Sequence, residues 1–259
     1  MELSVSKISP GVPGVDPILP GTREFDDGLK VQYHDIAESV RQLEPYVVLI
    51  ANRTNRPIVA YSPVFQIERS GNPTVVITPQ FKYPNALQWV PGGHLARGRE
   101  LLPGEQRLAG AEFDIDSTPA YVDWLARLVT SYSQRFMQVT NVRIGIDAVI
   151  FWDGEVQGHD TSHLADHFLA YLKATQELCE CMLVSYERTQ AVEAAFIPVT
   201  QFYEATSIDS LVRSQDELAV YAALAAQDMQ RLRKQYPEEA IVAVLKQIRR
   251  SEPFAIRHS

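Results

Sequence analysis

Three histidines at a spacing of four residues carry the clearest chemical signal in the sequence. His159, His163 and His167 would share one face of a helix if all three were helical. Asp160 and Asp166 place carboxylate oxygens close by in the sequence. Imidazole and carboxylate groups are natural ligands of zinc and non-haem iron. The segment is therefore a candidate transition-metal site with His159, His163 and His167 as its ligands.

The same histidines also have a purely structural interpretation. A zincin helix places its general-base glutamate directly after the first histidine, whereas Leu164 follows His163 here. Asp160 has the side chain of a helix N-cap, which would leave His159 in the loop before the helix. His163 and His167 can then be solvated or paired with neighbouring aspartates. We therefore expect no cofactor, with a transition metal at the histidines as the alternative.

Motifs for other chemistry are absent from the sequence. It contains no Gly-x-Ser-x-Gly, no Gly-x-x-x-x-Gly-Lys and no Gly-x-Gly-x-x-Gly. Asp114 and Asp116 would point the same way on a strand, as an acid–base pair must, but any exposed strand face gives that geometry. Catalytic groups can also assemble from distant residues, so an enzyme is not excluded. We therefore favour a non-enzymatic function for this protein.

Aromatic residues gather in a segment that ends at a turn signal. Phe81, Tyr83 and Trp89 precede the turn Pro91-Gly-Gly. Exposed aromatic side chains are typical of the hot spots of protein interfaces, although core filling is the alternative. We take Phe81, Tyr83 and Trp89 as candidate partner-binding residues.

The residues before the histidine segment have the pattern of strands. Short β-rich runs such as 46–51 and 58–61 are separated by Gly, Pro and Asn clusters. Apolar and polar residues alternate most regularly in 142–152, which predicts a strand. A proline in the first turn and apolar residues three and four apart predict one helix over 119–137. The pattern indicates an antiparallel β-sandwich over 25–155 with one inserted helix.

Two of these strand segments resemble a known fold family. The runs Leu49-Ile-Ala-Asn-Arg-Thr-Asn-Arg-Pro-Ile-Val-Ala-Tyr61 and Ile146-Asp-Ala-Val-Ile-Phe-Trp-Asp-Gly154 are similar to strands of immunoglobulin-like β-sandwich modules in uncharacterised bacterial proteins. The resemblance implies a fold and a structural or interaction role. It implies no catalytic residues, since a fold alone does not carry a function.

The flanking parts of the chain have other patterns. Residues 1–24 are rich in Pro and Gly without apolar periodicity, which indicates an extended or mobile arm. Residues 156–259 are predicted as a helical region, with one long helix from Asp160 or Thr161 to about Ala195. The apolar residues of that helix recur in a four–three spacing, which is typical of a seam between helices. We expect self-association or assembly through this seam.

Composition narrows the classes of partner and compartment. The 259 residues are 46% hydrophobic and 22% charged, with a net charge of −8, so a basic nucleic-acid-binding surface is not expected. No apolar run approaches the roughly 18–20 residues of a membrane span. The sequence before Ile8 lacks the pattern of a signal peptide, and only two cysteines are present. We expect a cytoplasmic protein, unless a native leader has been removed.

These patterns together predict an α+β protein whose β-sandwich is followed by helices. The favoured function is a non-enzymatic protein-interaction or assembly module that binds neither nucleic acid nor membrane. The alternative is a metal-dependent enzyme with its site at His159, His163 and His167, near the expected boundary between 25–155 and 156–259.

Overall fold

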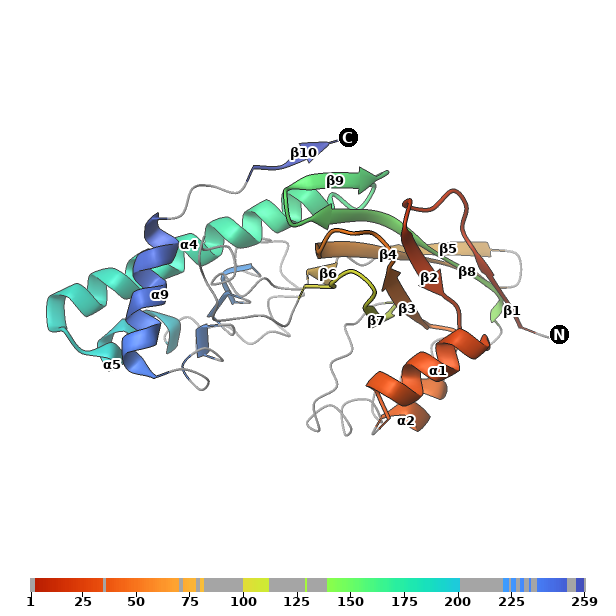
Figure 1. Ribbon diagram of the computed structural model, residues 1–259, viewed down its shortest axis with the longest axis horizontal. Coiled ribbons are helices and arrows are strands. Elements are labelled where there is room, and N and C mark those ends of the chain that lie inside the picture. The colour runs from red at the N-terminus through yellow and green to blue at the C-terminus, as the bar shows by residue number, and fades with distance from the viewer. Residues whose placement is uncertain are drawn as a thin grey trace. The chain divides into compact units, whose positions relative to one another are not determined.

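The fold is drawn in Figure 1 from a computed structural model of the chain. The structure describes residues 3–34, 36–69, 72–77, 80–81, 100–111, 129, 139–200, 221–223, 225–226, 229–230, 233, 237–250 and 255–258. They divide into two compact units. The first unit holds the described residues of 3–82, 100–164 and 256–258, and the second holds those of 165–255. The structure is thus α+β, with β-sheets in the first unit and helices in the second.

The larger sheet of the first unit is built around two long strands. β4 (Ile58–Arg69) and β8 (Val139–Phe151) pair antiparallel along most of their lengths (Figure 1). The described order is β10-β9-β8-β4-β5, while β1 also pairs with β8 and β6 with β4. The shorter strands are β1 (Ser4–Lys7), β5 (Asn72–Ile77), β6 (Gln80–Phe81), β9 (Glu155–Gly158) and β10 (Arg257–His258). β8 confirms the strand that alternation predicts at 142–152.

A smaller antiparallel sheet and two helices complete the first unit. The sheet has the strand order β2-β3-β7. The helices α1 and α2 lie between β2 and β3 in the sequence. The bounds are β2 (Val15–Ile18), α1 (Arg23–Gln32), α2 (Ala37–Arg41), β3 (Val47–Asn52) and β7 (Gln106–Gly110). Thr22 caps α1 by accepting a hydrogen bond from the Phe25 N–H. Both sheets and α1 contribute to one hydrophobic core, which includes Phe25, Leu49 and Phe65.

The second unit is helical and has its own core. Its described helices are α4 (Leu164–Thr189), α5 (Val192–Ala195) and α9 (Glu238–Arg250), apart from shorter described pieces between them. Met182 from α4, Phe196 after α5 and Leu245 from α9 are buried in one hydrophobic cluster. None of the helices in the described ranges combines the length and apolar character that crossing a bilayer requires.

The long predicted helix is present, but its ends differ from those expected. It begins at Leu164 rather than at Asp160, because residues before Leu164 form a turn in which His163 has a φ of 53°. It ends at Thr189, because Gln190 adopts a φ of 56°, outside the helical region. The apolar residues of the predicted seam therefore lie on two helices, α4 and α5, which are separated by a break at Gln190.

The prediction of an extended or mobile arm over 1–24 is wrong for much of that range. β1 pairs with β8 and β2 pairs with β3, and α1 begins at Arg23. Strands of four residues are too short to show periodicity, and Pro17 is tolerated because β2 lies at a sheet edge. The pairing with longer strands determines these elements.

Two other expectations need correction or lie outside the described residues. The larger sheet is not purely antiparallel, because β1–β8 and β10–β9 are parallel pairs. The two units meet in the sequence at Leu164 and Ala165 rather than at 155–156, and 256–258 return to the first unit. The predicted helix at 119–137 falls outside the described residues except for Val129, which is helical.

Candidate functional site

The three predicted metal-ligating histidines do not lie along one helical face. His159 follows β9 and its N–H donates to the Asp147 carbonyl at 2.8 Å, and His163 stands in the turn before α4. His167 lies inside α4, where its Nδ1 is 2.5 Å from the hydroxyl oxygen of Tyr221. Across the described part of the chain, no three His, Cys, Asp or Glu side chains gather closely enough to hold a metal ion. The structure gives the histidine site no support.

Polar contacts at the turn before α4 explain where the histidines stand. Buried Asp147 accepts a hydrogen bond from the Ser162 N–H through Oδ2 at 2.9 Å. The hydroxyls of Ser162 and buried Ser62 are 2.7 Å apart. Asp160 accepts from the Leu164 N–H at 2.6 Å, so its side chain satisfies the first helical donor. These contacts fix the turn to β4 and β8 and give it a structural role.

The predicted partner-binding aromatics cannot be placed as a group. The backbone of Phe81 belongs to β6, while its side chain lies outside the described residues, as do Tyr83 and Trp89. Asp114 and Asp116 lie outside them too. The partner site at these aromatic residues stays a prediction.

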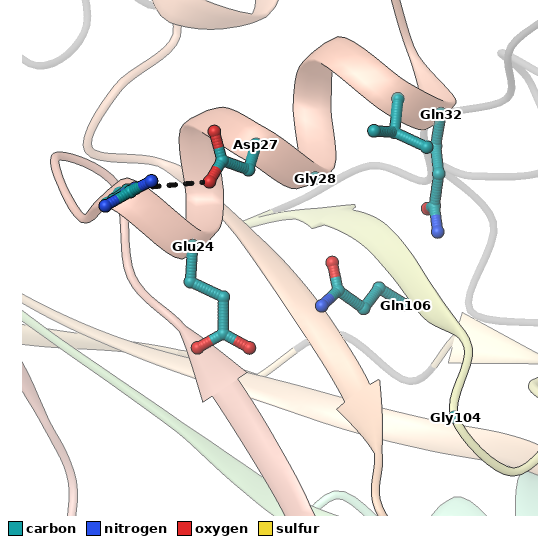
Figure 2. Close-up of a pocket in the computed structure, with 8 residues that line it drawn as sticks. Glu24, Asp27, Gly28, Gln32, Gly104 and Gln106 are labelled. Carbon is teal, nitrogen blue, oxygen red and sulfur yellow. Dashed lines mark ion pairs between the residues drawn. The ribbon is translucent and has the colours of Figure 1, made fainter.

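An open pocket in the first unit is the candidate site that sequence reasoning missed. It has a volume of about 560 Å³ and lies between α1 and the start of β7 (Figure 2). Its lining residues are Arg23, Glu24, Asp27, Gly28, Val31, Gln32, Gly104 and Gln106. The volume falls in the range of about 300–1,000 Å³ typical of ligand pockets.

Gly28 allows the two walls of the pocket to approach each other. A Cβ at Gly28 would lie 2.6 Å from Gln106 Oε1 and 2.6 Å from Leu49 Cδ1. The side chain of Gln106 can therefore lie directly against α1 (Figure 2). Glycine inside a helix lowers the stability of the helix by up to about 1 kcal/mol relative to alanine. At this position the loss of helix stability accompanies the close approach of the two walls. A mid-helix glycine after an acidic first turn was the sequence signal that could have located the pocket.

The charged residues that line the pocket are two carboxylates of α1, Glu24 and Asp27, and one cation, Arg23. Asp27 forms an ion pair with Arg23 at 3.6 Å between side chains that are 60% and 95% exposed (Figure 2). Glu24 accepts a hydrogen bond from Arg53, which also donates to Asp16 at 2.7 Å. These hydrogen bonds, first the one that Arg53 donates to Glu24 and then the one to Asp16, raise the pKa of Arg53. Glu24 is thus paired with a half-exposed arginine that does not line the pocket, while the partner of Asp27 is highly exposed.

A second charged cluster joins two turns of the first unit. Arg56 donates to Asp153 at 2.6 Å and to Glu155 at 2.9 Å, and its guanidinium lies 3.9 Å from the Phe151 ring centroid. Burial would raise the pKa of Asp153, but hydrogen bonds from Arg56 and from the Glu155 N–H outweigh it and lower the pKa. A hydrogen bond from Gln157, together with Arg56, lowers the pKa of Glu155. The cluster holds the β3–β4 turn against the β8–β9 turn.

Comparison with known proteins identifies no relative of this chain. No family model, curated protein or solved structure matches the chain. The geometry of the described residues therefore carries the functional argument.

Proposed function

We propose that the protein is a non-enzymatic interaction module that binds a basic side chain of a protein partner in the α1 pocket. The observation that carries this proposal is the open pocket of about 560 Å³ with Asp27 and Glu24 on one wall. Its volume suits one extended lysine or arginine side chain with part of its backbone.

The charges around the pocket favour a cationic occupant. Arg23, the partner of Asp27, is 95% exposed, and an ion pair between such exposed groups contributes about 0–1 kcal/mol. A ligand cation can therefore replace Arg23 at Asp27 at little cost. The net charge of −8 on the chain also attracts cations during diffusional encounter.

Uncharged groups of the pocket complement the rest of a basic side chain. Val31 is 82% exposed on α1 and can contact the aliphatic part of a lysine or arginine side chain. The side-chain amides of Gln32 and Gln106 offer oxygen acceptors and N–H donors for a peptide backbone (Figure 2). The combination is more specific to a basic peptide segment than to an inorganic cation.

The seam of the long helix is a weaker basis for an interaction surface. Its residues Leu164, Phe168, Tyr171, Met182 and Phe196 are all buried within the chain. A second copy would have to displace existing contacts to pack against them. The metal-dependent alternative also lacks a supporting observation among the described residues.

An immunoglobulin-like sandwich remains part of the proposal. The segment 49–61 spans β3 of the smaller sheet and β4 of the larger sheet, and the two sheets share one hydrophobic core. A strand–turn–strand that passes between two packed sheets is common in such modules. This likeness fits a binding role and supplies no catalytic residue.

The binding proposal is tested by titration with minimal basic probes. Nα-acetyl-lysine methylamide and Nα-acetyl-arginine methylamide are added to ¹⁵N-labelled protein, with the acetyl-glutamate analogue as the charge control. We expect chemical-shift changes in α1 and at 104–106, including the side-chain amides of Gln32 and Gln106. The acetyl-glutamate analogue should leave these signals in place.

Two carboxylate variants separate pocket binding from general charge attraction. Asp27→Asn removes a charge from the pocket, and we expect affinity to fall about three- to tenfold. Glu38→Gln removes a carboxylate that is 80% exposed on α2 and does not line the pocket. Equal weakening by both variants, or shifts confined to other parts of the chain, would rule out the pocket as the binding site.

A further inference from the structure

The last described strand occupies an edge of the larger sheet. β10 pairs in parallel with β9, with Arg257 opposite Glu155 and His258 opposite Val156. The Arg257 N–H donates to the Gly154 carbonyl at 2.9 Å, and its side chain donates to the Asp153 carbonyl at 2.9 Å. β9 pairs with β8 on its other side, so without β10 it would be an open edge.

The connection between these two strands is unusually long. Parallel neighbours need a crossover connection, commonly a single helix. Here the chain between β9 and β10 includes residues 165–255, which belong to the second unit. β10 is therefore far from β9 in the sequence, and a second copy of the chain carries the same segment with the same donor groups for β9 and the turn before it.

The contacts that hold β10 in place are few and exposed. Both of its residues are exposed, and only two register pairs join it to β9. The Arg257–Asp153 ion pair is 3.9 Å long between side chains that are 67% and 48% exposed. Such a pair contributes about 0–1 kcal/mol, and each of the two Arg257 hydrogen bonds adds about 0.5–1.5 kcal/mol, so release of the strand costs a few kcal/mol at most.

We propose that β10 exchanges between two copies of this chain, so that Ile256–His258 of one copy pairs with β9 of the other. The occupant is the same segment of a second copy, because the Arg257 side chain donates to the Asp153 carbonyl and its backbone N–H donates to the Gly154 carbonyl. Exchange reproduces these contacts between copies, which makes it a low-cost route to a dimer. The surface is separate from the α1 pocket and does not depend on ligand binding there.

Mixed single-cysteine copies test the exchange directly. One copy carries Glu155→Cys and the other Arg257→Cys, both with Cys181→Ser, and the mixture is treated with a short bis-maleimide. Because the two cysteines are on different chains, a crosslink between positions 155 and 257 in excess of random collision requires exchange. Cys179 does not compete, since burial raises the pKa of its thiol to about 12 and keeps it inaccessible and protonated. We expect a crosslinked dimer whose 155–257 linkage is identified by mass spectrometry.

A matched mixture and an unsubstituted protein complete the test. Glu38→Cys replaces Glu155→Cys in the control, because Glu38 is 80% exposed on α2 and has no register partner in β10. Arg257→Cys also removes the side-chain anchor, so light scattering of the unsubstituted protein over a wide concentration range is a second readout. A dimer fraction that rises with concentration and falls in Arg257→Glu supports exchange. Crosslinking no greater than the control together with a monomer at every concentration would overturn it.

Discussion

Among the glycines that the structure describes, Gly158 is the one at which an added methyl group should affect the fold most. It has a φ of 116°, and a Cβ there would lie 2.2 Å from the Asp147 carbonyl oxygen. That atom belongs to the backbone of β8, so it cannot move aside as a side chain can. We expect Gly158→Ala to lower the free energy of unfolding by about 3 kcal/mol or more, measured by urea denaturation.

Gly104 is the matched control for Gly158. Its φ is 83°, but a Cβ there would meet no atom within 4 Å. Gly104→Ala should therefore cost only the backbone strain of about 1 kcal/mol. Similar losses in the two variants would show that φ alone, rather than contact with the Asp147 carbonyl, sets the cost.

The histidine spacing shows what sequence can and cannot predict about a site. The N-capping chemistry of Asp160 was visible in the sequence, and its side chain does accept from the first helical N–H at Leu164. The left-handed φ of His163 was not visible, because it results from hydrogen bonds of the turn to Asp147 and Asp160. A spacing of four indicates a shared face only when every residue is helical.

At the scale of elements, Arg56 joins two turns through a contact that acid should weaken. Asp153 has a lowered pKa in the folded protein. Its contribution to stability is therefore present above the unfolded-state value of about 3.9 and is lost as pH falls through the folded value. The pair with Asp153 contributes at most about 1 kcal/mol, because the Asp153 side chain is 48% exposed.

The variant Arg56→Met tests this pH dependence. We expect it to be less stable than the unsubstituted protein at pH 7, with a smaller difference at pH 3, as measured by urea denaturation at each pH. Loss of the stacking on Phe151 should remain at both values. Arg23→Met is the control, since its side chain is 95% exposed. A difference that stays constant from pH 7 to pH 3 would contradict the contribution of Asp153.

Long elements were predictable from sequence because their own periodicity specifies them. β8 and α4 extend over 13 and 26 residues, enough for alternation and helical spacing to repeat several times. β1 and β10 have four and two residues, and each is a strand only because it pairs with a longer one. Their pairing partners lie more than a hundred residues away for β1 and across the second unit for β10, which no local pattern records.

At the scale of the whole molecule, the described residues form two hydrophobic cores, one in each unit. The first includes Phe65 in β4, and the second includes Phe196 after α5. The change from a strand pattern to a helical pattern near 156 was visible in the sequence. The turn that follows β9 nevertheless belongs to the first unit, because it contacts Asp147. Side-chain hydrogen bonds, rather than the transition from strand to helix, place the boundary at Leu164 and Ala165.

Two separate cores predict that the units unfold in separate steps. Phe65 and Phe196 are 0% and 1% exposed, so each Phe→Ala substitution should cost about 3–5 kcal/mol by leaving a cavity. In differential scanning calorimetry we expect two transitions, with Phe65→Ala lowering one midpoint by many degrees and Phe196→Ala the other. Each variant is the control for the other, because the residue type and burial match. A single transition that both substitutions lower equally would mean that the two cores unfold cooperatively.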